Sequence, residues 1–145
     1  MSFTFSLQKV LELKEHERNQ ADEAWNEATS EFEEVAMELY HLLKQKEEME
    51  NDYHGALEKG ISISHLQHYQ TRLSDLERII HRSQKETQRA RAKMQSSEHK
   101  RTLRAVDVKK YEKVKQKKQE QYASWQKAND MKSLDEIAVQ QFMWK

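Results

Sequence analysis

Apolar side chains recur at alternating intervals of four and three residues through the first part of the chain. Stepping in this way from Leu7 to Ala56 reaches fifteen positions, and twelve of them are apolar or aromatic. A strict 3.5-residue repeat over about seven heptads is typical of the seam of a left-handed coiled coil, which is narrower than the apolar stripe of a globular helix. We therefore expect a first long helix over about residues 4–57.

A turn is expected directly after this helix. Gly60 can adopt the positive φ angle of a helix end, and Ser64 followed by Gln67 has the spacing of a capping box at the start of a new helix. The chain has no proline and only two glycines, so this is its one convincing interruption. We place the turn at about residues 58–64.

A second long helix is expected after the turn. The stepping by three and four resumes at Leu66 and continues to Trp125, although the seam is polar or small between residues 83 and 104. The pattern predicts this helix over about residues 65–128, with a weakly packed middle.

The carboxyl-terminal residues are expected to extend past the first helix. If the chain folds back at the turn, residues face each other where their numbers add to about 122, so the first helix begins opposite about 115–119. Roughly 25–30 residues then form an overhang. Within it, Ser133 and Glu136 form another capping-box pair, which predicts a separate short helix at about 134–143.

Charge favours pairing of the two helices within one chain. Residues 1–60 carry 15 acidic and 6 basic side chains, whereas residues 61–145 carry 10 acidic and 19 basic ones. Each arm repels a copy of itself and attracts the other arm, although a single exposed ion pair contributes only about 0–1 kcal/mol. The sequence predicts an all-α fold, a long two-helix antiparallel coiled coil with a C-terminal overhang. We expect a single domain over residues 1–145 and a monomer on its own.

The composition excludes several classes of function. The chain has no cysteine, and its two glycines stand apart at positions 55 and 60. Disulfide frameworks, thiolate nucleophiles, cysteine-based zinc sites and glycine-rich phosphate loops are therefore excluded, and no cofactor is expected. No run approaches 18 apolar residues, so we expect no transmembrane segment. The first ten residues lack the apolar core of a secretory signal.

Few residues have the spacing of a reactive site. His65, His68 and His81 have no carboxylate or thiolate cluster beside them, so we interpret them as ordinary exposed histidines and expect neither a catalytic nor a metal site. The six lysines of Lys109–Lys118 suggest binding of nucleic acid or anionic lipid, but part of this run faces the acidic first helix. A solvated face or a contact to an acidic protein surface is favoured, and no nucleic-acid partner is expected.

The aromatic residues form two groups. Trp25, Phe32 and Tyr53 occupy seam positions, where core packing is expected. The aromatic residues of the overhang have no partner on the first helix, and unpaired aromatic side chains favour a protein interface. They are Tyr122, Trp125, Phe142 and Trp144.

Three stretches carry a resemblance to a known family. They are FSLQKVLELKEHE from Phe5, the tip Gly60-Ile-Ser with His68-Tyr69-Gln70 after it, and MKSLDEIAVQQF ending at Phe142. With these, the chain resembles the FliJ family of the bacterial flagellar type III export apparatus. The resemblance covers essentially the whole chain, including its length and the position of its turn.

The resemblance implies a nonenzymatic protein similar to the central stalk, or gamma subunit, of rotary ATPases. It implies that the chain sits in the middle of the hexameric export ATPase FliI and promotes its assembly and activity. It also implies a link to the cytoplasmic part of the export gate protein FlhA, and contacts with FliH and export chaperones. The implied location is cytoplasmic, peripherally associated with the inner face of the cell membrane at the flagellar base, in the service of motility and chemotaxis.

The resemblance further implies two contact faces. The open end, where the first helix begins and the second continues past it, would enter the ATPase ring through Leu7, Leu11, Leu13, Lys115, Lys118, Tyr122 and Trp125. A face near the tip would contact the gate through Leu42, Gln45, Met49, Arg72, Leu76, Ile79 and Ser83. Related proteins have an aromatic residue in place of Arg72 and an imidazole in place of Ser83. Leu42, Met49 and Leu76 are also seam positions, where core packing is the simpler interpretation.

Two other functions fit the same pattern. One is a generic coiled-coil adaptor, or a stalk protein of virulence-type secretion, whose members have a similar shape. The other is nucleic-acid binding through residues 100–118, which predicts association that depends strongly on salt.

Overall fold

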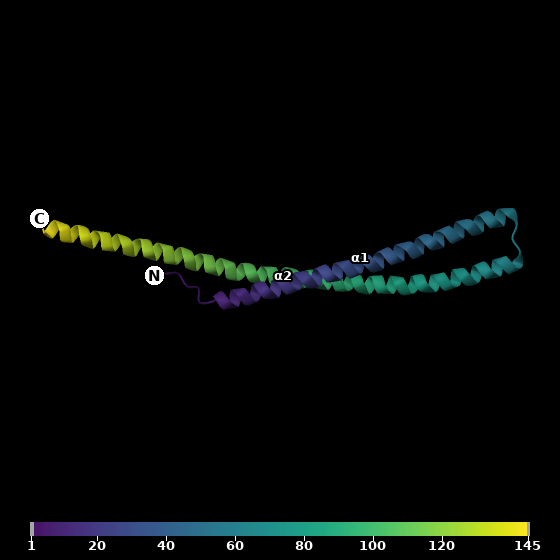
Figure 1. Cartoon of the computed structure of the whole chain (residues 1–145), viewed down its shortest axis with the longest axis horizontal. Helices are drawn as coiled ribbons and strands as arrows, with labels where there is room; N and C mark the ends of the chain where they lie inside the picture. The colour runs from purple at the N-terminus through teal and green to yellow at the C-terminus, as the bar shows by residue number, and fades with distance from the viewer. Residues whose placement is uncertain (1, 145) are drawn as a thin grey trace. The chain divides into compact units, whose positions relative to one another are not determined.

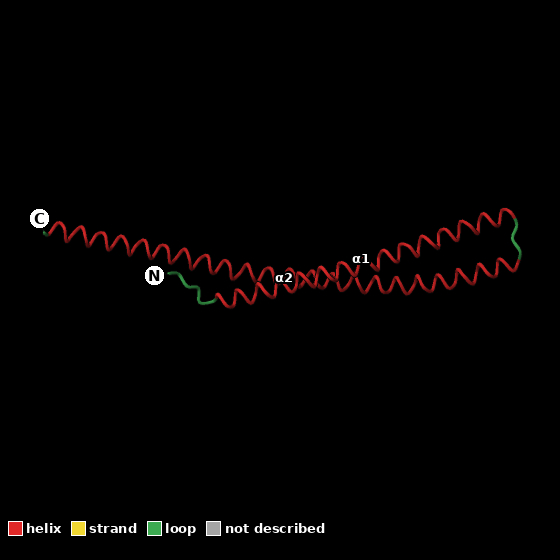
Figure 2. Tube along the Cα trace, viewed as in Figure 1, coloured by secondary structure: helices red, strands yellow, loops and turns green. Residues whose placement is uncertain are grey.

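The computed structural model describes residues 2–144. Within that range it contains two helices, α1 (Gln8–Lys59) and α2 (Ile63–Met143), and no strand. A short loop at residues 60–62 joins them, and a non-helical segment precedes α1 (Figure 1, Figure 2). The predicted all-α helical hairpin is confirmed.

The chain divides into two compact units, and each helix contributes to both. One is Ala21–Arg101, which we call the hairpin unit; the other, the end unit, combines the residues up to Gln20 with those from Thr102 onward. The single domain expected over residues 1–145 stays a prediction.

In the hairpin unit, α1 and α2 run antiparallel from the loop (Figure 2). The rings of Tyr53 and Tyr69 stack with their centroids 4.1 Å apart. Lys46 Nζ lies 3.5 Å from Oε1 of Glu77. The residue numbers add to 122 in the first pair and to 123 in the second, so the expected register is confirmed.

Ion pairs join the acidic α1 to the basic α2, as the charge pattern indicates. Lys93 Nζ lies 3.0 Å from Oε2 of Glu31, and Arg101 Nε lies 2.9 Å from Oδ1 of Asp22. All four side chains are more than a third exposed, so each pair adds little stability by itself. Together, however, they favour one register over its neighbours.

In the part of the hairpin seam that lies beyond Ile80 from the loop, the buried side chains are small or polar. Ala21, Ala28, Ser83 and Thr87 are buried, and Thr87 Oγ1 donates a hydrogen bond of 2.8 Å to the carbonyl oxygen of Ser83. Such side chains bury less apolar area than leucine or isoleucine would at the same positions, so this part of the seam gains less from the hydrophobic effect.

In the end unit, the N-terminal segment packs against α2 before α1 begins. Phe5 is buried in a cluster with Leu11 and Val108, and Phe3 packs against that cluster. The predicted helix start near residue 4 is therefore wrong, and α1 begins at Gln8. Alternate residues of an extended segment point to the same side, so both phenylalanines can reach α2 only if this segment is not helical.

The turn confirms the role of one predicted residue and corrects another. Gly60 has a φ of 89°, as expected at a helix end. The cap of α2 is Ser62 rather than Ser64: its Oγ accepts a hydrogen bond of 3.2 Å from the backbone N–H of His65 and lies 2.8 Å from His65 Nδ1. The Ser62 hydroxyl caps a free backbone N–H in the first turn, so α2 starts at Ile63.

The separate helix predicted at 134–143 is not present, because α2 continues without a break to Met143. The capping-box pair Ser133 and Glu136 lies inside the helix. Residues 129–133 contain no glycine or proline, and a serine within a helix costs only about 0.5 kcal/mol relative to alanine. The local signal is therefore too weak to end the helix.

Candidate interaction surfaces

Three leucines predicted to contact the ATPase lie at the start of the end unit. Leu13 is 54% exposed, and Leu7, which directly precedes α1, is also exposed. Leu11, in contrast, is buried against Val108 and Phe5. Leu11 thus holds the helix pair together, and only Leu7 and Leu13 present their side chains to a partner.

The other four predicted residues of this face are on α2. Lys118 is exposed and Lys115 is half-buried, while Trp125 is 52% exposed. The ring of Tyr122 lies near two others, with centroid distances of 5.7 Å to Phe3 and 6.0 Å to Trp125. Phe3, which precedes α1, is thus a partner that the heptad pattern did not reveal. The alternation of Phe3 and Phe5 was the available signal.

The last part of α2 carries exposed apolar side chains beyond the positions that the heptad stepping reached. Met131, Leu134 and Phe142 are exposed, and α2 continues here beyond the N-terminal segment (Figure 1). Met131 follows Tyr122 by nine residues, which is about two and a half turns at 3.6 residues per turn. Met131 therefore lies on the side of α2 opposite to Tyr122.

The residues predicted for the gate contact are all in the hairpin unit, at different depths. Gln45, Arg72 and Ile79 are exposed, and Leu42 and Met49 are half-buried. Leu76 and Ser83 are buried, and Ser83 Oγ has no hydrogen-bond partner within residues 2–144. Leu76 and Ser83 therefore pack between the helices, and a direct contact to a partner can use only the other five.

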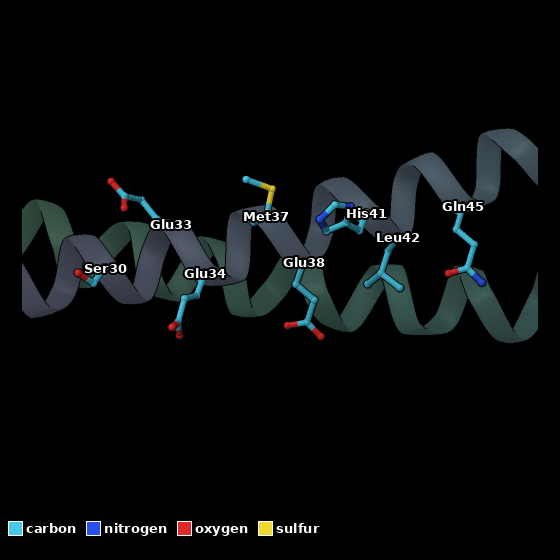
Figure 3. A pocket seen from close by; sticks show the side chains of 8 residues that line it. All are labelled: Ser30, Glu33, Glu34, Met37, Glu38, His41, Leu42 and Gln45. Atoms are coloured by element: carbon cyan, nitrogen blue, oxygen red, sulfur yellow. The ribbon is translucent and has the colours of Figure 1, made fainter.

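A shallow groove along α1 includes part of this face. It has a volume of ≈ 720 Å³, and Figure 3 shows Ser30 at one end and Leu42 with Gln45 at the other. Glu33 and Glu34 also line it, around the exposed Met37. The groove thus presents negative charge beside an apolar side chain.

A second cavity lies at the tip of the hairpin unit. Its volume is ≈ 470 Å³, and both helices and the loop line it. Met49 and Arg72, both predicted for the gate contact, are among its lining residues, as are Tyr53 and Tyr69. Burial raises the pKa of the Tyr69 hydroxyl above 10.0, and the nearby Glu50 carboxylate adds to the shift.

Other kinds of site have no support in the described part of the chain. Residues 2–144 contain no group of three or more histidine, cysteine or acidic side chains that could hold a metal ion. In the same range, neither helix has a stretch long and apolar enough to cross a membrane. His65 takes part in the cap of α2, and His68 lines the tip cavity.

Comparisons with known proteins agree with these features. The family described as "Flagellar FliJ protein" matches residues 3–145. The flagellar FliJ protein of Bacillus subtilis (strain 168) is 36% identical over 143 residues, which cover 99% of this chain and 97% of that protein. No solved structure matches the chain. A match of this extent, across both helices and the turn between them, shows that the chain belongs to the FliJ family of flagellar proteins.

Proposed function

We propose that this chain is a nonenzymatic component of the flagellar export apparatus. In this proposal it is the central stalk of the hexameric ATPase FliI, promotes the assembly and activity of that ring, and links it to the export gate protein FlhA. The observation that carries the proposal is the end unit, which presents exposed basic and aromatic side chains beyond a helix pair held by its own packing. Membership of the FliJ family supports flagellar export over a virulence-type adaptor.

A stalk must keep its two helices in a fixed register to transmit rotation or an assembly state. In the end unit, Arg104 Nη1 lies 3.2 Å from Oε2 of Glu17, and the same carboxylate oxygen lies 3.4 Å from Lys14 Nζ. Beside these pairs, the cluster of Phe5, Leu11 and Val108 excludes water. Apolar burial gives the strength of the contact, and the charges disfavour a slipped register.

The surface that would enter the ring consists of the predicted residues that are exposed or half-buried. Lys118 and the half-buried Lys115 would meet acidic loops of the ATPase, and Trp125 would provide apolar area. Aromatic side chains at the centre of an interface often dominate its binding energy. The full set is Leu7, Leu13, Lys115, Lys118, Tyr122 and Trp125, with Leu11 as the packing residue beneath it.

The gate contact would use the hairpin unit. Gln45, Arg72 and Ile79 would contact FlhA directly. Leu42 and Met49 would contribute from the edge of the seam. Leu76 and Ser83 would support this surface by packing between the helices. FliH and export chaperones are further proposed partners. The proposed location is cytoplasmic, at the inner face of the membrane at the flagellar base.

The proposed stalk role can be tested by adding this chain to purified FliI with ATP. We expect this chain to increase ring formation and ATP turnover, and we expect Lys118→Glu with Trp125→Ala to abolish most of that increase. Lys85→Glu is the matched control, because Lys85 is also exposed but lies in the hairpin unit. If the chain has no effect at any ratio, or if the control variant fails as badly as the double variant, the proposed stalk contact is wrong.

A further inference from the structure

The tip cavity is assembled from three parts of the chain. Met49 and Ala56 line it from α1, Ile61 from the loop, and Tyr69 and Arg72 from α2. Its ≈ 470 Å³ falls within the range of about 300–1,000 Å³ that is usual for ligand pockets. Most of its wall is apolar, so it favours an apolar group that fills it.

One wall of the cavity is a rigid aromatic pair. The rings of Tyr53 and Tyr69 are nearly parallel, at an interplanar angle of 8° and a centroid distance of 4.1 Å. Each ring comes from a different helix, so the pair is held by the packing of the hairpin itself. A preformed wall of this kind lowers the ordering cost of binding, and it suits another aromatic side chain.

The basic and acidic side chains that line the cavity come from different helices. Arg72 and His68 lie on α2, whereas Asp52 lies on α1. Arg72 is exposed, and among residues 2–144 it makes no ion pair or hydrogen bond. An unpaired guanidinium at the edge of an apolar cavity is suited to a carboxylate, which it can bind through two parallel hydrogen bonds.

We propose that the tip cavity anchors one aromatic side chain of a partner peptide, and that a carboxylate next to that side chain binds Arg72. The anchor would occupy the space between the tyrosine pair and Ile61. The proposal rests on the proposed gate contact, because Met49 and Arg72 belong to that face. It adds that the partner segment carries an aromatic side chain beside a carboxylate. A single anchor of this size implies weak binding, with a Kd of about 1 mM or somewhat below.

Nuclear magnetic resonance of the isotope-labelled full chain can test this chemistry directly. The probe is the peptide acetyl-GDEWEDG-amide, added up to about 5 mM. We expect concentration-dependent shifts that are confined to the residues of the cavity, foremost Tyr53, Ile61 and Tyr69. One matched peptide carries lysine in place of each acidic residue, and a second carries alanine in place of tryptophan. Both are expected to cause no shifts at these positions.

A pair of arginine variants tests the role of the charge. Arg72→Gln is expected to weaken binding of the acidic peptide about fivefold. Arg78→Gln is the control: Arg78 is exposed on the same helix, pairs with Asp75 at 3.2 Å and does not line the cavity. We expect it to leave the affinity unchanged within about twofold. Both side chains are exposed, so both variants keep the fold.

Three results would overturn the proposal. They are no shifts at 5 mM peptide, equal shifts with either the lysine or the alanine peptide, and equal weakening by the two arginine variants. Co-purification with the cytoplasmic part of FlhA distinguishes failure of the cavity proposal from failure of the gate contact. If FlhA binds while the peptide does not, the cavity chemistry is wrong and the gate contact stands. If the peptide binds while FlhA does not, the cavity serves another acidic segment.

Discussion

The Nε atom of Arg101 lies 2.9 Å from Oδ1 of Asp22, across the two helices of the hairpin unit. The same guanidinium lies 4.4 Å from the ring centroid of Trp25, so one side chain makes an ion pair and a cation–π contact. Arg101 occupies a seam position of the heptad pattern, which would normally be apolar. Its long stem and flat head allow it to cover Trp25 while the charge stays near water.

The first prediction concerns this side chain. Arg101→Ala should lower the free energy of unfolding by about 1–2 kcal/mol, because it removes the ion pair, the contact to Trp25 and the packing of the stem. Urea denaturation followed by circular dichroism measures the change. Arg89→Ala is the control, since Arg89 is exposed on the same helix, and it should change stability by less than about 0.5 kcal/mol.

The second prediction tests the packing of the N-terminal segment. Phe5 is 6% exposed within its cluster, whereas Phe142 is 81% exposed at the end of α2. Phe5→Ala should destabilise the chain by about 3 kcal/mol through lost burial and the cavity left behind, and Phe142→Ala should have almost no effect. Thermal unfolding of both variants gives the comparison. Equal stability of the two would mean that the segment before α1 does not pack as described.

The third prediction uses the two glycines as a matched pair. Gly60 has a φ of 89° at the turn, whereas Gly55 lies inside α1 and an added Cβ there meets no atom within 4 Å. Gly60→Ala should cost about 1 kcal/mol or more, because an alanine is strained at positive φ. Gly55→Ala should stabilise by about 0.5–1 kcal/mol through helix propensity. Opposite signs in denaturant unfolding are the decisive outcome.

The fourth prediction concerns stability at high pH. Burial raises the pKa of Tyr69 above its ordinary value of 10.0, and Glu50, Tyr53 and Glu77 act in the same direction. The folded chain thus holds this proton more tightly than the unfolded chain. The resulting stability is fully present below about pH 10 and is lost as the pH rises through the raised pKa of the folded state. Tyr69→Phe should flatten this part of the stability profile, whereas Tyr40→Phe, at an exposed position, should leave it unchanged.

The heptad spacing by itself predicted two antiparallel helices and their register, but not where each helix begins and ends. The repeat from Leu7 to Ala56 has one seam, and folding at Gly60 brings that seam against the repeat that begins at Leu66. The pairing of Tyr53 with Tyr69 follows from this register. These features can be predicted from the sequence alone. The seam periodicity, a glycine suited to a positive φ and the charge of each helix are all local properties of the sequence.

Only the tertiary structure decided which predicted contact residues are accessible. Leu11, Leu76 and Ser83 are buried, while Leu13 and Ile79 are exposed, although all five stood in the same two predicted faces. Accessibility depends on what lies across the helix pair, and a heptad position states only the direction of a side chain. The partner at that position, such as Val108 for Leu11, appears only when both helices are placed together.

The tertiary structure also decided the two features that depend on segments outside the repeat. Phe3 and Phe5 pack on α2 because that apolar surface is available beside a non-helical segment. Their alternation indicates a shared side of the segment, but it does not identify the surface that they contact. The tip cavity likewise arises where α1, the loop and α2 meet at one place. The sequence by itself determined the direction and pairing of the helices, and the three-dimensional packing determined the surfaces, because burial is a property of neighbours that are distant along the chain.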